Sequence, residues 1–207
     1  MKHYKIPIDS DHYEIFFGAI RSKKDVIKLL MNTVKYATTE LRVTGEHKYY
    51  LHIIVDDMNR FIYESENKIF SVRSPFRVMG NENELTFYTA YIANIDNAIT
   101  SNVLSMLNDE KFDSPNSFDF LGLIEESFEL DIDDVWPFII DLISFEDGYL
   151  RYDYDPENEK DRLHPLSHLD ICYTTASTYK IGTYKKPCVN YLTSLLNNKV
   201  DALYLER

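Results

Sequence analysis

The stretch that decides the fold lies near the C-terminus, where residues 148–156 read GYLRYDYDP and residues 164–171 read HPLSHLDI. In the first segment Arg and Asp alternate with Leu and Tyr, which is the pattern of a β-strand with one polar and one apolar face. The second segment ends in a similar alternation. We therefore expect strands at residues 150–155 and 166–174, followed by a third strand at residues 178–183.

The polar faces of the first two strands carry the residues most suited to chemistry. Side chains of a strand point alternately to its two faces, so Arg151, Asp153 and Asp155 share one face. His168 and Asp170 share a face in the next strand. If the two strands pair, we expect these polar faces to coincide.

This pairing would assemble a possible reactive site. The candidate catalytic residues are Asp153, Asp155, His164, His168 and Asp170, and the candidate metal ligands among them are Asp153, His168 and Asp170. Carboxylates suit Mg²⁺ or Mn²⁺, and an imidazole adds affinity for Mn²⁺ or Zn²⁺. A metal-dependent nuclease or phosphodiesterase, in which the metal activates water, is therefore one hypothesis.

A purely structural interpretation explains the same residues without any reaction. Tyrosines interleaved with Arg and Asp are typical of a half-exposed strand. Under this interpretation Arg151 pairs internally with Asp153 or Asp170, and His168 is a hydrogen-bonded strand residue. Cys172 shares the face of His168, and we interpret it as a buried strand cysteine and not as a nucleophile.

Upstream of this stretch the sequence predicts an α+β fold that combines an antiparallel meander, helices and the C-terminal β-β-α unit. A helix is expected at residues 23–41, with Ser22 as its N-cap, Asp25 completing a capping box, and Gly45 as a break after it. β-branched and aromatic residues predict a three-stranded meander. Its strands are expected at residues 49–55, 61–63 and 69–73.

The middle of the chain predicts mainly helices. Residues 85–107 alternate like a strand at first, but their apolar spacing favours a helix over at least residues 95–107. Two short helices follow, one around residues 120–128 and one beginning near Asp133. Pro137 is expected in the first turn of the second helix, because a proline further inside a helix removes a hydrogen bond.

Two polar segments are expected to be loops, at residues 80–83 and 108–116. The second is a weak sub-boundary within a single predicted domain of residues 1–207. The last predicted helix begins with Pro187 in its first turn, after the three C-terminal strands.

The charge of the chain limits its partners. The net charge is −12 and the isoelectric point is about 4.9, which argues against the broad basic surface that phosphate contacts require. Between Asp109 and Asp155 there are fifteen Asp or Glu, with only Lys111 and Arg151 as permanent cations. The leading hypothesis is a non-enzymatic interaction or accessory protein that binds a protein partner through an acidic surface. Another alternative is an acidic mimic of nucleic acid that blocks a DNA-binding protein.

The compartment and the cofactors are predicted from sequence motifs that the chain lacks. The two cysteines predict no disulfide scaffold, and no apolar run has the length of a signal peptide or of a membrane span. We therefore expect a cytoplasmic protein with no membrane partner. No phosphate-binding or dinucleotide-binding glycine motif is present, so no cofactor is expected, apart from Mg²⁺ or Mn²⁺ under the nuclease hypothesis.

The C-terminal stretch resembles an uncharacterised domain family of bacterial genomes. The family pattern is Arg-x-Asp-Tyr-Asp-Pro, then His-Pro-x-x-His-Leu, a short basic strand and a Pro-initiated apolar helix. The matching segments are residues 151–156, 164–169, 179–181 and 187–196. The resemblance implies an association with phage-defence or mobile-element genes, and it implies no activity.

A second resemblance concerns Arg162 and His168. Their spacing is similar to the signature of the HEPN ribonucleases, in which an Arg precedes a His by a few residues. In that family the motif lies on a helix. Here Pro165 and its neighbours predict a loop and a strand.

Overall fold

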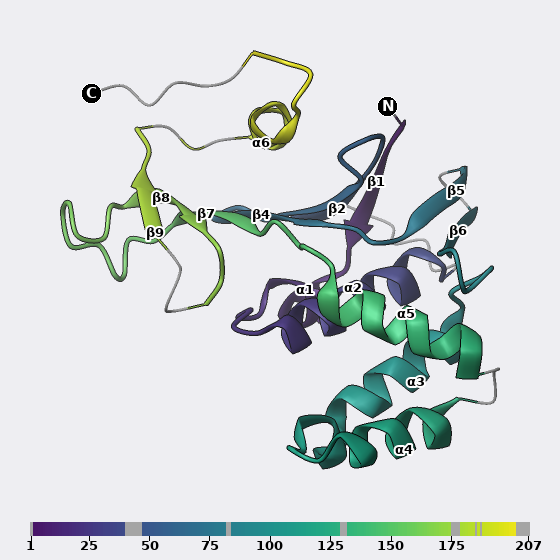
Figure 1. The fold of residues 1–207 in the computed structure, drawn as a ribbon. Helices are drawn as coiled ribbons and strands as arrows, with labels where there is room; N and C mark the ends of the chain where they lie inside the picture. The colour runs from purple at the N-terminus through teal and green to yellow at the C-terminus, as the bar shows by residue number, and fades with distance from the viewer. Residues whose placement is uncertain are drawn as a thin grey trace. The chain divides into compact units, whose positions relative to one another are not determined.

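The computed structural model describes most of the chain, as six α-helices and nine strands (Figure 1). The described residues are 2–39, 47–81, 84–128, 132–174, 179–184, 186 and 188–201. Seven strands form one sheet and two form a separate hairpin, which confirms the predicted α+β class. Among the described residues, no helix has the length and apolar character that crossing a membrane would require.

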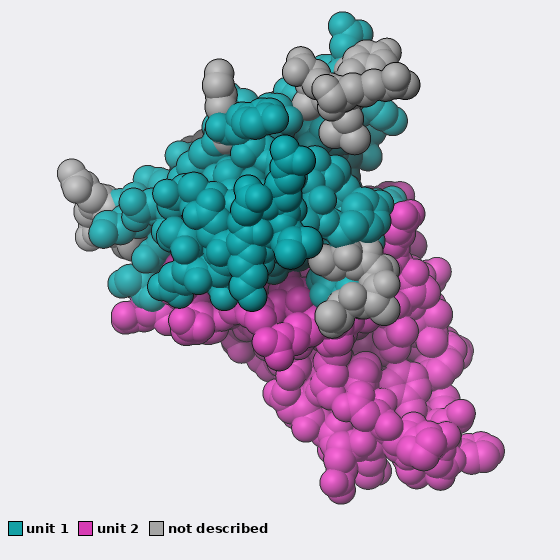
Figure 2. All heavy atoms as spheres, turned by 90° about the vertical axis from the view of Figure 1, so that its left-hand side faces the viewer, with its two compact units in different colours: residues 1–10, 45–73, 148–207 teal, residues 11–44, 74–147 magenta. Residues whose placement is uncertain are grey.

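The chain divides into two compact units, which are coloured separately in Figure 2. Unit 1 consists of residues 1–10, 45–73 and 148–207, and unit 2 consists of residues 11–44 and 74–147. Unit 2 is thus formed by two insertions into the chain of unit 1. The predicted sub-boundary at residues 108–116 lies inside unit 2 and does not separate the two units. The single domain predicted for the whole chain stays a prediction.

Unit 1 contains an antiparallel sheet with the strand order β1-β2-β3-β4-β7-β8-β9. Its elements are β1 (Lys2–Ile8), β2 (Tyr49–Val55), β3 (Arg60–Glu64), β4 (Lys68–Arg73), β7 (Leu150–Tyr154), β8 (Ser167–Ile171), β9 (Tyr179–Gly182) and α6 (Val189–Leu196). The meander β2-β3-β4 is present as predicted. The three C-terminal strands are also present, but β7 ends one residue and β8 three residues before the predicted ends. β1 lies where the sequence predicts no element, and it pairs with β2 across more than forty residues of chain.

One face of the sheet packs against α6. Tyr152 of β7 and Leu169 of β8 belong to one buried apolar cluster with Leu192 of α6. Because side chains alternate along a strand, Arg151 and Asp153 point to the opposite face. Pro187, which was predicted in the first turn of the helix, lies outside the described residues, as does Thr178 at the start of the predicted third strand.

Unit 2 contains the remaining helices and the β5–β6 hairpin. Its elements are α1 (Tyr13–Phe17), α2 (Lys23–Ala37), β5 (Arg77–Asn81), β6 (Glu84–Tyr88), α3 (Asn97–Asn108), η2 (Glu110–Asp113), α4 (Ser117–Ser127) and α5 (Ile132–Ser144). The predicted capping box of α2 is confirmed. Ser22 Oγ accepts a hydrogen bond from the Asp25 N–H at 3.2 Å, and the Asp25 carboxylate accepts from the Ser22 N–H at 3.0 Å. Leu41 and Gly45, which were expected at the end of this helix, lie outside the described residues.

The loop predicted at residues 80–83 is wrong in its first half. Gly80 and Asn81 belong to β5, and residues 82 and 83 lie outside the described residues. Gly80 has a φ of +117°, and a Cβ there would lie 1.9 Å from the Glu84 carbonyl oxygen, so this position requires glycine. The ambiguous segment after it divides into strand β6 and helix α3, which begins after the N-cap Asp96.

The proline of α5 does not lie in the first turn, contrary to the prediction. The helix begins at Ile132, so Pro137 lies inside it and has no N–H to donate to the carbonyl four residues before. Burial explains why the helix tolerates this proline. Val135, Phe138 and Ile139 are at most 1% exposed, and packing of this apolar face offsets one missing hydrogen bond.

Candidate functional site

The candidate site lies on the face of the unit 1 sheet opposite α6, where β7, β8 and β9 are neighbours. Arg151 pairs with Asp170 in the β7–β8 register, and Asp153 pairs with His168. Asp170 in turn pairs with Lys180 of β9. Paired residues of antiparallel strands point to the same face, so the predicted polar faces do meet, with Lys180 as a further member.

Arg151 and Lys180 bind the two carboxylates of this cluster. Arg151 Nε lies 2.7 Å from Asp153 Oδ2, and Arg151 Nη2 contacts Asp170 Oδ2. Lys180 Nζ lies 2.7 Å from Asp170 Oδ1. Asp170 is 3% exposed, and a carboxylate this deeply buried requires compensating charge. Two cations and two carboxylates make the cluster neutral by itself.

His168 is held as a neutral imidazole by its two hydrogen bonds. Its Nδ1 lies 2.7 Å from the carbonyl oxygen of Pro165, and a carbonyl can only accept, so Nδ1 carries the proton. Its Nε2 lies 2.9 Å from Lys180 Nζ, and an ammonium group can only donate, so Nε2 accepts. The atom that a general base or a metal ligand would use is therefore already bonded to Lys180.

Asp155 and His164 form a second contact beside the cluster. β7 ends at Tyr154, so Asp155 lies just after the strand and not within it as predicted. His164 Nε2 lies 3.5 Å from Asp155 Oδ2, and the His164 ring meets the His168 ring edge to face at 4.8 Å between centroids. Burial acts to raise the pKa of Asp155, but hydrogen bonds from Asn158 and the nearby histidines hold it below its usual value.

Burial also changes the ionisation of Tyr149 and Arg151. Burial raises the pKa of Tyr149 to about 12, although Arg151, whose Nη1 lies 3.5 Å from the hydroxyl, opposes the shift. Burial acts to lower the pKa of Arg151, but Tyr149, Asp153 and Asp170 raise it above its ordinary value. At neutral pH Arg151 is thus charged and Tyr149 is not, and neither is suited to exchange protons with a substrate.

The three predicted metal ligands satisfy a distance test. Single ligand atoms of Asp153, His168 and Asp170 all lie within 4.8 Å of one another. Lys180 Nζ, however, contacts both Asp170 and His168, so a divalent cation would have to displace this ammonium group. Even then the cluster would carry a net charge of +1 with Arg151 in place. The residues as arranged do not fit a resident metal ion, and the metal hypothesis stays a prediction.

A second cluster of titratable side chains, on the α6 face of the same sheet, was not predicted. His52 Nε2 donates to Glu64 Oε2 at 3.0 Å, and His52 Nδ1 lies 2.9 Å from His3 Nε2. The hydrogen bond from His52 lowers the pKa of Glu64, although burial opposes this. Burial lowers the pKa of His3, as do the nearby His52 and Lys5. The sequence could have indicated this cluster through the predicted pairing of β2 with β3, because that pairing places the side chains of His52 and Glu64 on the same face of the sheet.

The prediction for Cys172 is wrong, and the loop and strand predicted around Arg162 and His168 are confirmed. Cys172 is not a buried strand residue, because β8 ends at Ile171 and Cys172 is exposed with a φ of +66°. That left-handed backbone does not continue a strand. Arg162 lies in the turn between β7 and β8 while His168 lies in β8, so this pair is not on a helix as in the HEPN ribonucleases.

Lys180 is the member of the cluster that sequence reasoning missed. The signal was the predicted strand at residues 178–183, in which Lys180 alternates with Tyr179 and Ile181. Placing Lys180 against Asp170 also requires the register of β8 and β9, and a shift by one residue would turn it to the other face.

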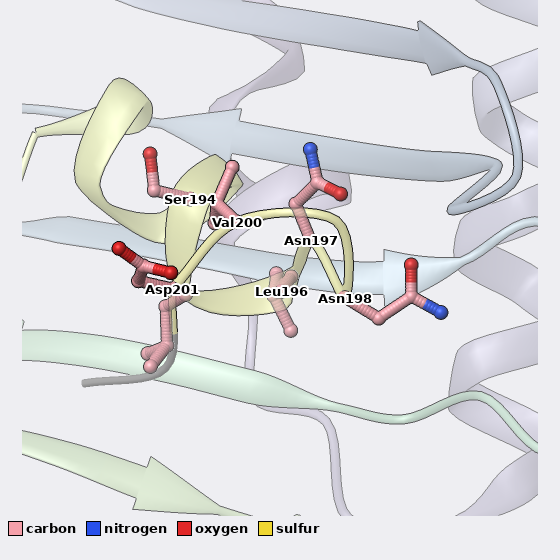
Figure 3. A pocket seen from close by; sticks show the side chains of 7 residues that line it. Ser194, Leu196, Asn197, Asn198, Val200 and Asp201 are labelled. Atoms are coloured by element: carbon pink, nitrogen blue, oxygen red, sulfur yellow. The ribbon is translucent and has the colours of Figure 1, made fainter. Parts of the chain in front are cut away.

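A pocket of about 260 Å³ lies at the C-terminal end of α6 (Figure 3). Its lining residues are Ser194, Leu195, Leu196, Asn197, Asn198, Val200 and Asp201. All of them come from one short segment, and none belongs to either polar cluster. With Asp201 as the single ionisable side chain in its lining, this pocket is not a candidate active site.

Comparisons with known proteins assign no family to this chain. A scan against protein-family models, a search of curated proteins and a search of solved structures found no match.

Proposed function

We propose that this protein acts by binding, and that its partner is a protein that presents positive charge to unit 2. The observation that carries the proposal is the charge of residues 112–147, which include eleven Asp or Glu and no Lys, Arg or His. A surface of one sign attracts partners of the opposite sign and speeds their encounter.

The carboxylates of this segment are largely accessible. The exposed ones on α4 and α5 are Glu125, Glu126, Asp133, Asp134 and Asp141. Lys111 pairs with Glu126 at 2.8 Å, but this pair is exposed and screened by solvent, so it removes little of the negative field.

The charge balance of the β7–β9 cluster also favours binding over catalysis. Arg151 and Lys180 already bind Asp153 and Asp170, and Lys180 donates to the lone pair of His168. A hydrolytic site needs a carboxylate or an imidazole that is able to accept a proton from water. The cluster is better suited to joining three strands.

A metal-dependent phosphodiesterase is the second candidate, because three ligand atoms approach one another within 4.8 Å, but it requires that Lys180 leave Asp170 and His168. It predicts Mn²⁺-dependent cleavage of nucleic acid that is lost in His168→Ala. An acidic mimic of nucleic acid is a special case of the binding proposal in which the partner is a DNA-binding protein. Asp153 is not suited to such a surface, because it is paired with Arg151.

The binding proposal is tested with a labelled peptide of ten lysines and two matched triple variants of the full chain. The first set neutralises unit 2 through Glu125→Gln, Asp141→Asn and Glu146→Gln. The control set makes the same change of charge in unit 1 through Glu157→Gln, Glu159→Gln and Asp161→Asn. All six carboxylates are exposed.

We expect the unit 2 set to weaken peptide binding by about tenfold and the control set by less than about twofold, measured by fluorescence anisotropy. Equal losses in both sets would mean that only the net charge matters. That outcome, or an absence of binding, would contradict the proposal. The resemblance to a defence-associated family suggests that a natural partner be sought among phage-defence and mobile-element proteins. The proposed partner is defined by its positive charge alone.

A further inference from the structure

Helix α4 has apolar residues on two sides, and only one side is buried. Leu123 and Ile124 are at most 4% exposed, and Phe120 packs its ring near Trp136 at 6.0 Å between centroids. On the other side Phe118 is 80% exposed and Leu121 is 37% exposed. These two residues are three positions apart, so they lie next to each other on the helix surface.

Gly122 gives this exposed side a distinct shape. It lies four positions after Phe118 and therefore one turn further along the same side of the helix. A Cβ built at Gly122 would meet nothing within 4 Å, so internal packing does not require a glycine here. Glycine weakens a helix interior relative to alanine. Its effect is to leave the backbone accessible beside a projecting aromatic ring.

Two carboxylates of α4 lie near this apolar site. Glu125 is exposed and lies seven positions after Phe118, which places it on the same face two turns away. Asp119 follows Phe118 directly, and its carboxylate accepts hydrogen bonds from Ser114 Oγ at 2.7 Å and from the Asn116 amide at 3.1 Å. Neither α4 nor α5 contains a basic residue. A group that covers Phe118 therefore lies near Asp119 and Glu125, and no cation of α4 or α5 balances their charge.

We propose that Phe118, Leu121 and Gly122 form a docking site for an amphipathic helix of a partner protein, with apolar residues on one face and Lys or Arg at its borders. This inference rests on the proposed function and names the chemistry of the partner. The ring projects from α4, and Gly122 adds no side chain one turn further on, so a partner helix can approach the backbone beside the ring. The basic borders of the partner helix would face Asp119 and Glu125.

Charge distinguishes this occupant from the alternatives. A second copy of the chain packing through the same site would bring Glu125 near its own counterpart, and like charges in contact weaken association. An anionic membrane surface would be repelled by the same carboxylates. A basic helix satisfies both the apolar and the charged part of the surface.

The test uses the full chain and two labelled peptides of eighteen residues made only of leucine and lysine. One has its leucines at helical spacing and the other is a scrambled sequence of the same composition. Phe118→Ser is the main variant, and Leu121→Ser serves if Phe118→Ser fails to fold by far-UV circular dichroism. Leu163→Ser is the matched control, because Leu163 is 88% exposed and lies in unit 1.

We expect the amphipathic peptide to bind about tenfold more tightly than the scrambled one, and Phe118→Ser to remove most of that difference. Leu163→Ser should leave it unchanged. Equal binding of both peptides, weakened only by neutralising the unit 2 carboxylates, would overturn the docking site and leave the proposed function intact. Absence of binding to either peptide would count against both. Sedimentation that shows self-association lost in Phe118→Ser would identify the occupant as a second copy and overturn the proposal.

Discussion

The two polar clusters of the unit 1 sheet hold their charges in different ways. The charges of the cluster on β7–β9 come from Arg, Lys and Asp side chains, which are types that keep their charge across the physiological pH range, and His168 joins it through a hydrogen bond to Lys180. The cluster on β1–β3 links His3, His52 and Glu64 in a row, and its hydrogen bonds depend on where the imidazole protons are. The first cluster is neutral by itself, and the second depends on pH.

This difference follows from position in the fold. The β7–β9 cluster connects three neighbouring strands, and its central carboxylate, Asp170, is 3% exposed, so it requires constant compensation. The β1–β3 cluster lies at an edge of the sheet, and His3 is exposed. A buried network at the centre of several strands is expected to contribute to stability, whereas an edge network is expected to respond to solvent conditions.

The largest expected effect comes from breaking the neutral cluster. Asp170→Asn removes one carboxylate and leaves Arg151 and Lys180 with Asp153 alone. We expect a loss of about 3 kcal/mol in the free energy of unfolding, because an uncompensated cation remains partly buried. Urea unfolding followed by circular dichroism measures this loss. The exposed Glu157→Gln on the β7–β8 connection is the control, and a loss as small as that of the control would contradict the structural role.

A smaller effect on stability is expected from Lys180→Met, which also tests whether the cluster can bind a metal ion. Lys180→Met keeps the apolar stem but removes the ammonium group, which leaves His168 Nε2 and Asp170 Oδ1 accessible to a cation. We expect a loss of stability of about 1 kcal/mol, because Lys180 is partly exposed. We also expect Mn²⁺ to raise the thermal unfolding temperature of this variant and not that of the wild type. An equal Mn²⁺ effect on the wild type would show that Lys180 does not prevent metal binding. The exposed Lys160→Met serves as the control.

The smallest effect concerns the pH-dependent cluster. The pKa of His3 is lowered from 6.5 and that of Glu64 is lowered from 4.5. As the pH falls, each group is protonated in the unfolded chain before it is protonated in the folded protein. The stability that each group contributes is therefore fully present above its unfolded pKa, and it is lost as the pH falls through the lowered folded pKa. We expect a decline of less than about 1 kcal/mol beginning near pH 6.5, since His3 is exposed.

His3→Gln should remove the first part of this decline, and Glu64→Gln should remove the part below pH 4.5. Chemical unfolding at a series of pH values measures both. A profile for His3→Gln that matches the wild type between pH 7 and pH 5 would show that the imidazole row does not control stability.

Local patterns in the sequence were sufficient for many elements. The alternation at residues 150–154 depends only on adjacent side chains, and the capping box of α2 joins Ser22 to a residue three positions away. Such features form from contacts within one turn or one short strand, so the sequence displays them directly. An ion pair of Arg151 with Asp153 or Asp170 was also predicted, because the two polar strands are close in sequence, and the structure shows both pairs.

The wrong predictions share a physical cause, because each of these local structures depends on contacts with residues far away in the sequence. Pro137 lies inside α5 because burial of its apolar face outweighs the lost hydrogen bond, and this burial is not visible from the proline alone. Cys172 lies outside the strand because β8 ends at Ile171, three residues before the predicted end at residue 174.

By itself the sequence determined the fold class, the meander, the C-terminal strands and the identity of most polar residues in the candidate site. Only the tertiary structure decided that β1 joins the sheet, that Lys180 binds Asp170, and that His3 lies against His52. The partners in the last contact are 49 residues apart in the chain. Strand register and long-range pairing are set by how the whole sheet buries its side chains, and no local window of sequence contains that information.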